Sequence, residues 1–475
     1  MLRKLLLATT ALVVAAALAV PAFAQGIPIR IVGKDLLTSN PDDVAHIQRI
    51  EDALRAKGTD LDLQLVDLPG ATYADALGVM LLSGDIPDLI YFQGGDQKMA
   101  DQGILEDLGP WLEKMPNAKA ALWPHNVERL ANYPYLLYIF PPRAPQPLIR
   151  TDWLEKTGME PPDTLEEYEA LFTAIRDGDY DGDGTANTYG MTAYLNTNEL
   201  DSIFNQAFGI TGTWMKNDAG EWTHARISNQ ERDKLTWYAK LAANGLFDKE
   251  YVTNTFDVKE DKFYTGRAGV IFASSPEVAD IYFGKMAQAH PDEDITLTLL
   301  PLPAGPGGQG LSAFDVSKES RGWAISSVSE HKAEVAALLD FIASPEGQVL
   351  DRLGFEGREY TKSGDTITYD PSISTWYARF FNAANWTPPS DWKSPAAQAH
   401  LANLSKWFKP DNSFVWPPEY AADLDAAENV YRSWVARFIT GEATMDQWDQ
   451  YVAEWKAAGG DNLTGYAVTV LDPTN

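Results

Sequence analysis

The N-terminal part of the chain alternates between short apolar runs and longer amphipathic stretches. Apolar runs at 29–32, 61–66 and 88–92 have the length and pattern of buried strands. Between them, apolar residues recur at helical spacing from 41 to 58 and from 73 to 83. This order predicts a doubly wound, mostly parallel α/β sheet, in which ligands collect at the carboxyl ends of the strands.

The pattern further along predicts a second α/β unit and a helical last third. Helices are expected from Thr164 onward and at 230–244, 258–265, 332–343, 430–440 and 445–458. Strands are expected at 268–273, 297–303 and 322–326, with a hairpin tip at 305–310. The proline-rich stretch 133–150 excludes a helix and predicts an extended crossing between the two units.

Composition excludes several classes of protein. The 475 residues exceed one ordinary hydrophobic core, so two or three domains are expected. With 38 basic and 67 acidic residues, the net charge of -29 argues against a nucleic-acid partner and an anionic membrane surface. The chain has no cysteine, which excludes disulfides, thiolate metal sites and a lipidated cysteine.

Residues 1–24 are typical of a secretory signal peptide. Arg3 and Lys4 precede an apolar run at 5–20, and Ala-Phe-Ala at 22–24 is a cleavage site of small residues. The run is short for a membrane-spanning helix, so cleavage is favoured over an uncleaved anchor. We expect a mature periplasmic protein that begins at Gln25 and has no membrane anchor.

The stretch 179–187 places oxygen ligands at the spacing of a calcium loop of the EF-hand kind. The expected ligands are Asp179, Asp181, Asp183, Thr185 through its carbonyl, and Asn187. Gly184 permits the sharp turn, but Gly190 stands where an EF-hand has its bidentate glutamate. A solvated acidic turn is the alternative interpretation.

A series of short blocks, in order along most of the mature chain, points to one family. The blocks are 82–90 (Leu-Ser-Gly-Asp-Ile-Pro-Asp-Leu-Ile), 149–154 (Ile-Arg-Thr-Asp-Trp-Leu), 162–168 (Pro-Asp-Thr-Leu-Glu-Glu-Tyr), 179–190, 263–269 (Phe-Tyr-Thr-Gly-Arg-Ala-Gly), 322–326 (Gly-Trp-Ala-Ile-Ser), 344–347 (Ser-Pro-Glu-Gly) and 439–442 (Ile-Thr-Gly-Glu). The series resembles the family 1 extracellular solute-binding proteins of ABC importers, in the branch that includes alginate- and oligosaccharide-binding members.

This resemblance implies the two-lobed fold of a type II periplasmic binding protein, with the ligand held between lobes that close about a hinge. One lobe is expected from 25–140 and 275–345, and the other from 150–272 and 350–475, with crossings at 141–149, 273–274 and 346–349. The resemblance also implies a structural Ca2+ in the 179 loop, although Thr188 stands where some members carry an acid. A monomer that delivers a saccharide to the transmembrane subunits of an ABC permease is expected, without enzymatic activity.

Sugar ligands require aromatic faces and polar groups at the loops that border the cleft. Most of the 15 tryptophans and 20 tyrosines must be structural, as expected for Trp323 within a strand. Position therefore selects the expected ligand contacts, which are Lys34, Asp35, Phe92, Gln93, Asp96, Tyr194, Asn196, Asn198, Ser275, Glu277, Trp416 and Tyr420.

Two other classes of protein stay open at this level. A secreted glycoside hydrolase would use a pair of carboxylates, and acids are plentiful, but no pair stands out in the sequence. A calcium-dependent adhesin is disfavoured because no repeats are found. The net charge argues mildly against a polyanionic ligand, and the local charge of the cleft decides that question.

Overall fold

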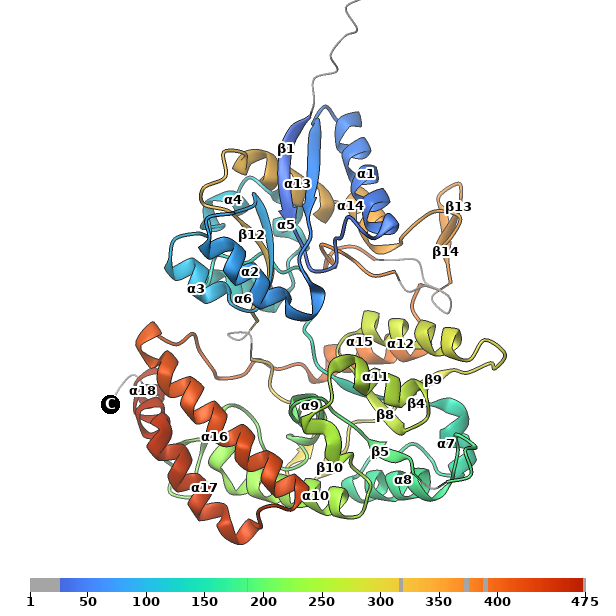
Figure 1. The fold of residues 1–475 in the computed structure, drawn as a ribbon, viewed down its shortest axis with the longest axis vertical. Helices are drawn as coiled ribbons and strands as arrows, with labels where there is room; N and C mark the ends of the chain where they lie inside the picture. Colours follow the sequence, from blue (N-terminus) through green and yellow to red (C-terminus); the bar gives the residue numbers. More distant parts are fainter. Residues whose placement is uncertain (1–25, 186, 316–318, 371–375, 388–391, 473–475) are drawn as a thin grey trace, which may run out of the picture.

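The computed structural model describes residues 26–185, 187–315, 319–370, 376–387 and 392–472, which form two lobes (Figure 1). Each lobe is built on one four-stranded sheet, as the α/β prediction requires. The expected signal peptide at 1–24 lies outside the described residues. Across these described ranges, no helix combines the length and the apolarity needed to cross a bilayer.

The sheet of the first lobe has the order β12-β3-β1-β2. Its strands are β1 (Ile27–Val32), β2 (Leu61–Val66), β3 (Leu89–Gln93) and β12 (Arg321–Ile325). Strand β1 is parallel to β2 and β3, whereas β12 runs antiparallel to β3. The N-terminal strand–helix pattern thus produces the parallel core that the sequence predicts.

Helices cover both faces of this sheet (Figure 1). They are α1 (Pro41–Ala56), α2 (Tyr73–Leu82), α3 (Asp96–Asp101), α4 (Gly109–Leu112), α5 (Pro116–Ala121), α6 (Pro124–Asn132), α13 (Lys332–Ala343) and α14 (Pro345–Arg352). Asn40 caps α1 by accepting a hydrogen bond from the Asp42 amide, and proline follows at the first helical position. Trp323 is 1% exposed and stacks on Phe380, so it packs in the core as predicted.

The second lobe contains a mixed sheet in the order β5-β8-β4-β9. Its strands are β4 (Gln146–Arg150), β5 (Tyr189–Met191), β8 (Ala268–Ala273) and β9 (Leu297–Leu299). Strand β4 runs antiparallel to both β8 and β9, and β5 is parallel to β8. Small two-stranded ribbons join β6 (Trp214–Lys216) to β7 (Trp222–His224) and β10 (Ala304–Gly305) to β11 (Gly308–Gln309). The second ribbon is the predicted hairpin tip.

The helices of the second lobe include the whole C-terminal part of the chain. They are α7 (Thr151–Thr157), α8 (Leu165–Asp177), α9 (Asn198–Phe204), α10 (Asn229–Ala243), α11 (Phe256–Tyr264), α12 (Pro276–Ala289), α15 (Pro395–Trp407), α16 (Ala421–Thr440), α17 (Trp448–Trp455) and α18 (Asp461–Leu471). Trp434, Trp448 and Trp455 are all buried where α16 and α17 meet. The tryptophans of these two helices are therefore structural.

Two of the three crossings lie elsewhere than the sequence predicted. The first runs between Ile139, in the core of the first lobe, and Ala144, in the core of the second. Residues 276–300, however, belong to the second lobe, because β9 pairs with β4 and α12 packs against β8. The second crossing therefore falls between Leu311 and β12 rather than at 273–274.

The third crossing is also displaced. The sequence predicted the third crossing within helix α14, but α14 packs on α13 and α1 in the first lobe. Phe381, further along the chain, still belongs to the core of that lobe. The chain leaves the first lobe only between Trp386 and Ser394. Ser275, at the predicted second crossing, is an N-cap whose hydroxyl accepts from the amide of Val278, so it marks a helix start instead. Ser344 caps α14 by accepting from the amide of Gly347.

Candidate functional site

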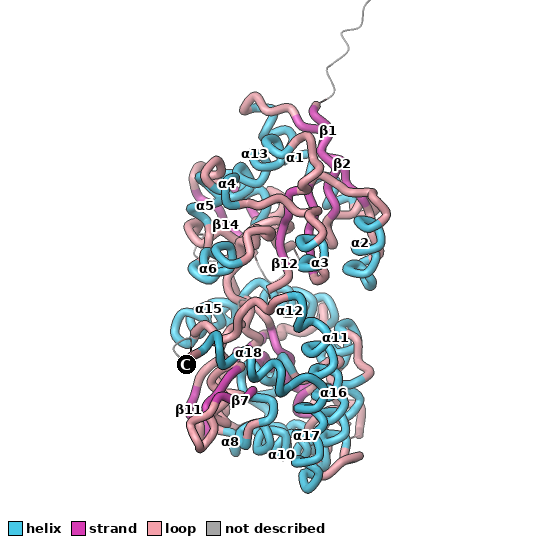
Figure 2. Tube along the Cα trace, turned by 90° about the vertical axis from the view of Figure 1, so that its left-hand side faces the viewer, coloured by secondary structure: helices cyan, strands magenta, loops and turns pink. Residues whose placement is uncertain are grey.

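A cleft of about 820 Å³ lies between the lobes. In Figure 2, α11 and α12 lie at the end of the second lobe that faces the first. The lining residues are Lys34, Asp35, Asn40, Asp42, Arg358, Glu359, Trp376, Tyr377 and Arg379 from the first lobe, Phe256, Glu260, Val278, Ile281, Tyr282 and Lys285 from the second, and Arg143 from the first crossing. A ligand here would touch both lobes and the hinge.

The local structure explains why these side chains meet. Lys34 and Asp35 follow the carboxyl end of β1, where open α/β sheets hold their ligands. Phe256 opens α11, whose start is fixed by the Thr255 hydroxyl, which accepts from the Val258 amide. The sequence therefore positions the two walls independently, one from each lobe.

Aromatic rings from opposite lobes line the cleft. Phe256 is 42% exposed and meets Tyr194 edge to face, with 5.5 Å between ring centroids. Tyr377, from the first lobe, is half-buried, and burial raises its pKa, helped by the nearby Asp35 carboxylate. Such rings provide the apolar faces on which sugar rings stack.

Most charged side chains of the cleft already have partners. Arg358 binds Asp42 through two hydrogen bonds of 2.8 and 2.9 Å and also reaches Glu359 at 2.6 Å. This pairing lowers the pKa of Asp42. Lys285 binds Glu260 at 2.6 Å in the same way. These pairs fix the shape of the walls and leave few charges for a ligand.

A second pocket of about 510 Å³ adjoins the first, since Arg143 lines both. Its wall includes Lys234, which is 1% exposed and bonded to Asp201 and Glu231 at 2.9 Å. Burial opposes the charge on Lys234, but the two carboxylates outweigh burial and raise its pKa. The two pockets together form an extended site.

The structure brings five of the expected ligand contacts to these cavities. Lys34 and Asp35 line the main cleft, and Asn198 lines the adjoining pocket. Ser275 and Glu277 line a small neighbouring cavity of about 80 Å³, which Arg143 also borders. Residues that follow the carboxyl ends of β1 and β8 therefore line cavities, which is where ligands of open α/β sheets gather.

Glu277, however, already binds partners in the protein. Its carboxylate contacts Arg352 of the first lobe at 3.3 Å, accepts from the Asn382 amide and lies 3.6 Å from Lys393. Burial works against its charge, but Lys393 and Arg352 prevail and lower its pKa. Glu277 therefore links the lobes at the hinge rather than facing the cleft.

The structure places the expected contacts at the end of β3 outside these cavities. Phe92 is 1% exposed and packs in the core, because β3 is an inner strand covered on both faces. Asp96 is 3% exposed, and burial raises its pKa although Arg129 lies 4.0 Å away. Gln93 is half-buried and pairs in register with Arg321 of β12. Within the described part of the chain, all three lie outside the cavities above.

The remaining expected contacts also lie outside those cavities. Tyr194 sits behind Phe256, and the Asn196 side chain accepts from the amide of Asn198 in a turn. Trp416 and Tyr420 belong to an aromatic cluster with Tyr466 of α18, with centroid distances of 5.4 and 4.7 Å. Mutual packing of aromatic side chains accounts for their position.

Sequence reasoning missed several residues of the cleft. Arg143 lies in the proline-rich crossing, and any residue of a crossing borders the space between lobes, so its charge was a usable signal. Tyr377 and Arg379 gave no such signal, because they follow no strand of either sheet. Only the tertiary fold places them opposite α11.

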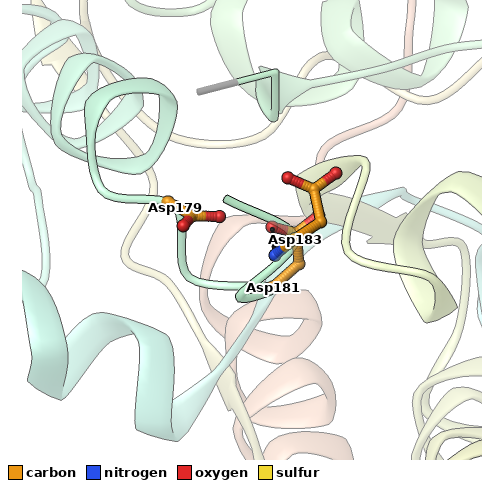
Figure 3. Close-up of side chains that lie close together, drawn as sticks. All are labelled: Asp179, Asp181 and Asp183. Atoms are coloured by element: carbon orange, nitrogen blue, oxygen red, sulfur yellow. Dashed lines mark hydrogen bonds between the residues drawn. The ribbon is translucent and has the colours of Figure 1, made fainter. Parts of the chain in front are cut away.

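The acidic loop after α8 gathers three carboxylates, as Figure 3 shows. Oxygens of Asp179, Asp181 and Asp183 lie within 4.8 Å of one another. Burial raises the pKa of Asp181, and its two neighbours add to the effect. Among the described residues, no hydrogen bond reaches the buried Oδ1 of Asn187. A cation would relieve the repulsion and satisfy this oxygen.

The structure explains why this loop lacks a glutamate. A Cβ at Gly190 would lie 2.3 Å from Cβ of Phe172, so no side chain fits there. Thr188 is buried, and its hydroxyl donates to the carbonyl of Gly266. A hard cation would therefore use the three aspartates, the Thr185 carbonyl, Asn187 and water, a set of oxygen ligands that suits Ca2+.

Comparison with known proteins gives consistent results. The family model for bacterial extracellular solute-binding proteins matches residues 43–349, more than half of the chain. Lipoprotein LipO of Bacillus subtilis (strain 168) is 24% identical over 92% of this chain and 90% of its own length. The polygalacturonan/rhamnogalacturonan-binding protein YtcQ of the same organism is 22% identical over 86% of this chain and 85% of its own.

Solved structures share the fold. The alginate-binding protein AlgQ2 superposes with a TM-score of 0.67 at 19% identity, covering 93% of this chain and 97% of its own. The substrate-binding protein FusA of Streptococcus pneumoniae, in complex with kestose, gives 0.67 at 17% identity, covering 94% and 99%. Both matches confirm the two-lobed α/β architecture.

Proposed function

The chain belongs to the bacterial extracellular solute-binding protein family, and on that premise we propose that it captures a saccharide between its lobes and delivers it to an ABC permease. The observation that carries this proposal is that one cleft is lined by aromatic rings from both lobes, Phe256 from the second and Tyr377 from the first. Sugar rings stack on such faces while surrounding polar groups bind their hydroxyls.

We further propose that the ligand is an oligosaccharide. The adjoining cavities of about 820 and 510 Å³ meet at Arg143. Together they exceed the roughly 300–1,000 Å³ typical of a site for one small molecule. Relatives named for polygalacturonan and for fructooligosaccharide support the same class of ligand.

Binding without chemistry is the simpler use of this cleft. A glycoside hydrolase needs two available carboxyl groups on either side of the scissile bond. Asp42, Glu260 and Glu359 are held by cations, and Asp35 lies beside Tyr377. The family match also describes solute binding. We therefore propose no enzymatic role.

The loop at 179–187 is proposed to hold a structural Ca2+, away from the ligand cleft. One similar structure is described as AlgQ2 without calcium ion and another as a FusA EF-hand mutant, which supports the proposal. EDTA should lower the melting temperature of the calcium-loaded protein, and Asp181→Asn should remove most of that difference. An identical melting curve with and without EDTA contradicts a structural cation.

The protein is proposed to act in the periplasm as a monomer after removal of residues 1–24. The absence of cysteine in the sequence supports a product without a lipid-modified cysteine, unlike the relative named as a lipoprotein. Fractionation of expressing cells, followed by N-terminal sequencing of the mature chain, tests both the compartment and the cleavage site. Recovery of the full-length chain in membranes contradicts this proposal.

A thermal-shift screen against mono- and oligosaccharides tests the capture function. A ligand that binds only the native state raises the melting temperature. Phe256→Ala should weaken that ligand about tenfold, whereas Val79→Ala, which removes a 71%-exposed side chain on α2, serves as the matched control. Release of reducing ends from a bound oligosaccharide, or no shift with any saccharide, would overturn the proposal.

A further inference from the structure

The charges of the cleft differ from those of the chain as a whole. The sequence carries 67 acidic against 38 basic residues. The main cleft, in contrast, is lined by five cations and four carboxylates. A ligand responds to the local field more than to the net charge, because intervening salt screens distant charges. The strongly acidic composition therefore does not exclude an anionic ligand.

Pairing within the protein leaves two of these five cations available. Arg358 and Lys285 bind carboxylates of the cleft, and Arg379 binds the buried Asp43 at 3.0 Å. Lys34 and Arg143 have no carboxylate within 4 Å among the residues that the structure describes. They stand on different parts of the fold, the first after β1 and the second in the crossing.

Arg143 is fixed in position although no carboxylate holds it. Its guanidinium donates to the hydroxyl of Ser274 at 2.6 Å. Burial disfavours its charge, but Tyr138 and Glu319 outweigh this effect and raise the pKa of Arg143. The fork of a guanidinium matches a carboxylate through two parallel hydrogen bonds. Little side-chain ordering then remains to be done when a ligand binds.

We propose that the saccharide bound in this cleft is acidic, and that Arg143 and Lys34 recognise its carboxylate groups. The inference rests on the proposed capture function and names the class of ligand. Two free cations at separate places in one cleft fit an oligomer that carries a carboxylate on more than one ring. A neutral oligosaccharide would displace water from both cations without supplying either of them with a charged partner.

Calorimetric titration of the full chain with matched ligands tests this inference. The probes are oligogalacturonides and alginate oligomers, each compared with its carboxyl-reduced form, which keeps length and most of the ring geometry but loses the charge. We expect at least one acidic series to bind at least tenfold tighter than its reduced form at low salt. This advantage should shrink as the ionic strength rises.

Variants assign the effect to the two cations. Lys34→Met and Arg143→Met should each lower the ratio of acidic to reduced affinity about tenfold, and Arg143→Lys should recover part of it because the charge remains. Lys57→Met is the matched control, since Lys57 forms an exposed pair with Glu346 away from the cleft. Melting curves without ligand identify any variant that fails to fold.

Each outcome separates the inference from the function on which it rests. Equal binding of acidic and reduced forms overturns the acidic class and leaves saccharide capture standing. If only neutral saccharides bind, the acidic class is likewise overturned and saccharide capture still stands. If no saccharide of any class binds, both the inference and the proposed function fail. An acidic preference that survives in both Met variants overturns the roles of Lys34 and Arg143.

Discussion

The contact between Glu277 and Arg352 offers a direct test of how the lobes are joined. Glu277 begins α12 in the second lobe and Arg352 ends α14 in the first, with 3.3 Å between their charged atoms. The two side chains are only 14% and 3% exposed. Glu277→Gln keeps the shape and removes the charge, so Arg352 becomes a buried cation without this partner.

The size of the effect follows from the geometry. At 3.3 Å and an effective dielectric constant of about 20, Coulomb's law gives about 5 kcal/mol for this pair. Removing one partner of a buried pair typically costs about 3–5 kcal/mol, because the other charge loses its compensation. We therefore expect Glu277→Gln to lower the free energy of unfolding by about 3–5 kcal/mol.

The cost should also depend on pH. Burial lowers the pKa of Lys393 to about 7, while Glu277 opposes this shift. Without Glu277 the pKa of Lys393 falls further, so near pH 6 the folded variant binds fewer protons at Lys393 than the folded wild-type protein does. Because proton binding to the folded state stabilises it, the loss of stability in Glu277→Gln should grow as the pH falls through about 7.

Urea unfolding, followed by tryptophan fluorescence at pH 8 and pH 6, measures how much Glu277→Gln lowers the free energy of unfolding. Glu346→Gln is the matched control, because Glu346 pairs with Lys57 at 2.7 Å but both are about half exposed, which predicts less than about 1 kcal/mol. Equal losses in the two variants would refute the reasoning. Ligand affinity at a temperature where the variant is folded should be unchanged, because Glu277 binds protein partners.

Three further predictions concern the core, the acidic loop and buried histidine. Phe92→Ala should lower the free energy of unfolding by about 3–5 kcal/mol in a urea titration, with saccharide affinity unchanged, because the ring is 1% exposed in the core. Gly190→Ala should reduce the melting temperature, since its Cβ would lie 2.3 Å from Phe172, whereas exposed Gly465→Ala should not. Burial lowers the pKa of His400 from 6.5 to about 4. The neutral imidazole therefore contributes about 3 kcal/mol to the free energy of unfolding above pH 6.5, and this contribution is lost as the pH falls toward 4. His400→Gln should make the unfolding free energy less sensitive to pH over that interval.

Local patterns predicted the elements well. The observed bounds of β2, β8 and α13 coincide with the predicted runs, because the spacing of apolar residues follows directly from the geometry of a strand or a helix. The helix start predicted at Thr164 is observed for the same reason, because its hydroxyl caps α8 by accepting from the amide of Glu167. These features depend on neighbours within a few residues, which a sequence displays.

Lobe membership could not be predicted in this way. Ser-Pro at 275–276 is a helix start whether the helix continues in the same lobe or enters the other. The decision rests on strand pairing, and β9 joins β4 across about 150 residues of intervening chain. Both lobes offer apolar strands of similar length, so the pattern alone does not distinguish them. Two crossings were misplaced for this reason.

The candidate site also combines residues that local sequence predicted with residues that only the tertiary fold brings together. Lys34 and Asp35 were predicted because they end a strand at the edge of the cleft, and the same rule failed for Phe92. Phe92 lies within β3 and packs in the core of the first lobe, whereas Lys34 and Asp35 come after the last residue of β1. Tyr377 lies opposite α11 only through the packing of the first lobe. Whether a residue near a strand end faces the core or the cleft depends on tertiary packing, which the sequence does not display.

Arg143 connects the cleft to the first crossing between the lobes. It lies in the first crossing and donates to Ser274 of the second lobe, yet it lines the same cleft as Lys34 of the first lobe. A ligand shifts the arrangement of two lobes only by the difference in its contacts between the arrangements. In the proposed function, a saccharide that reached Lys34 and Phe256 together would gain contacts if the lobes approached each other. If the proposed capture function holds, the walls of the cleft meet the physical condition for closure on a ligand, and Arg143 would place one ligand contact on the first crossing between the lobes.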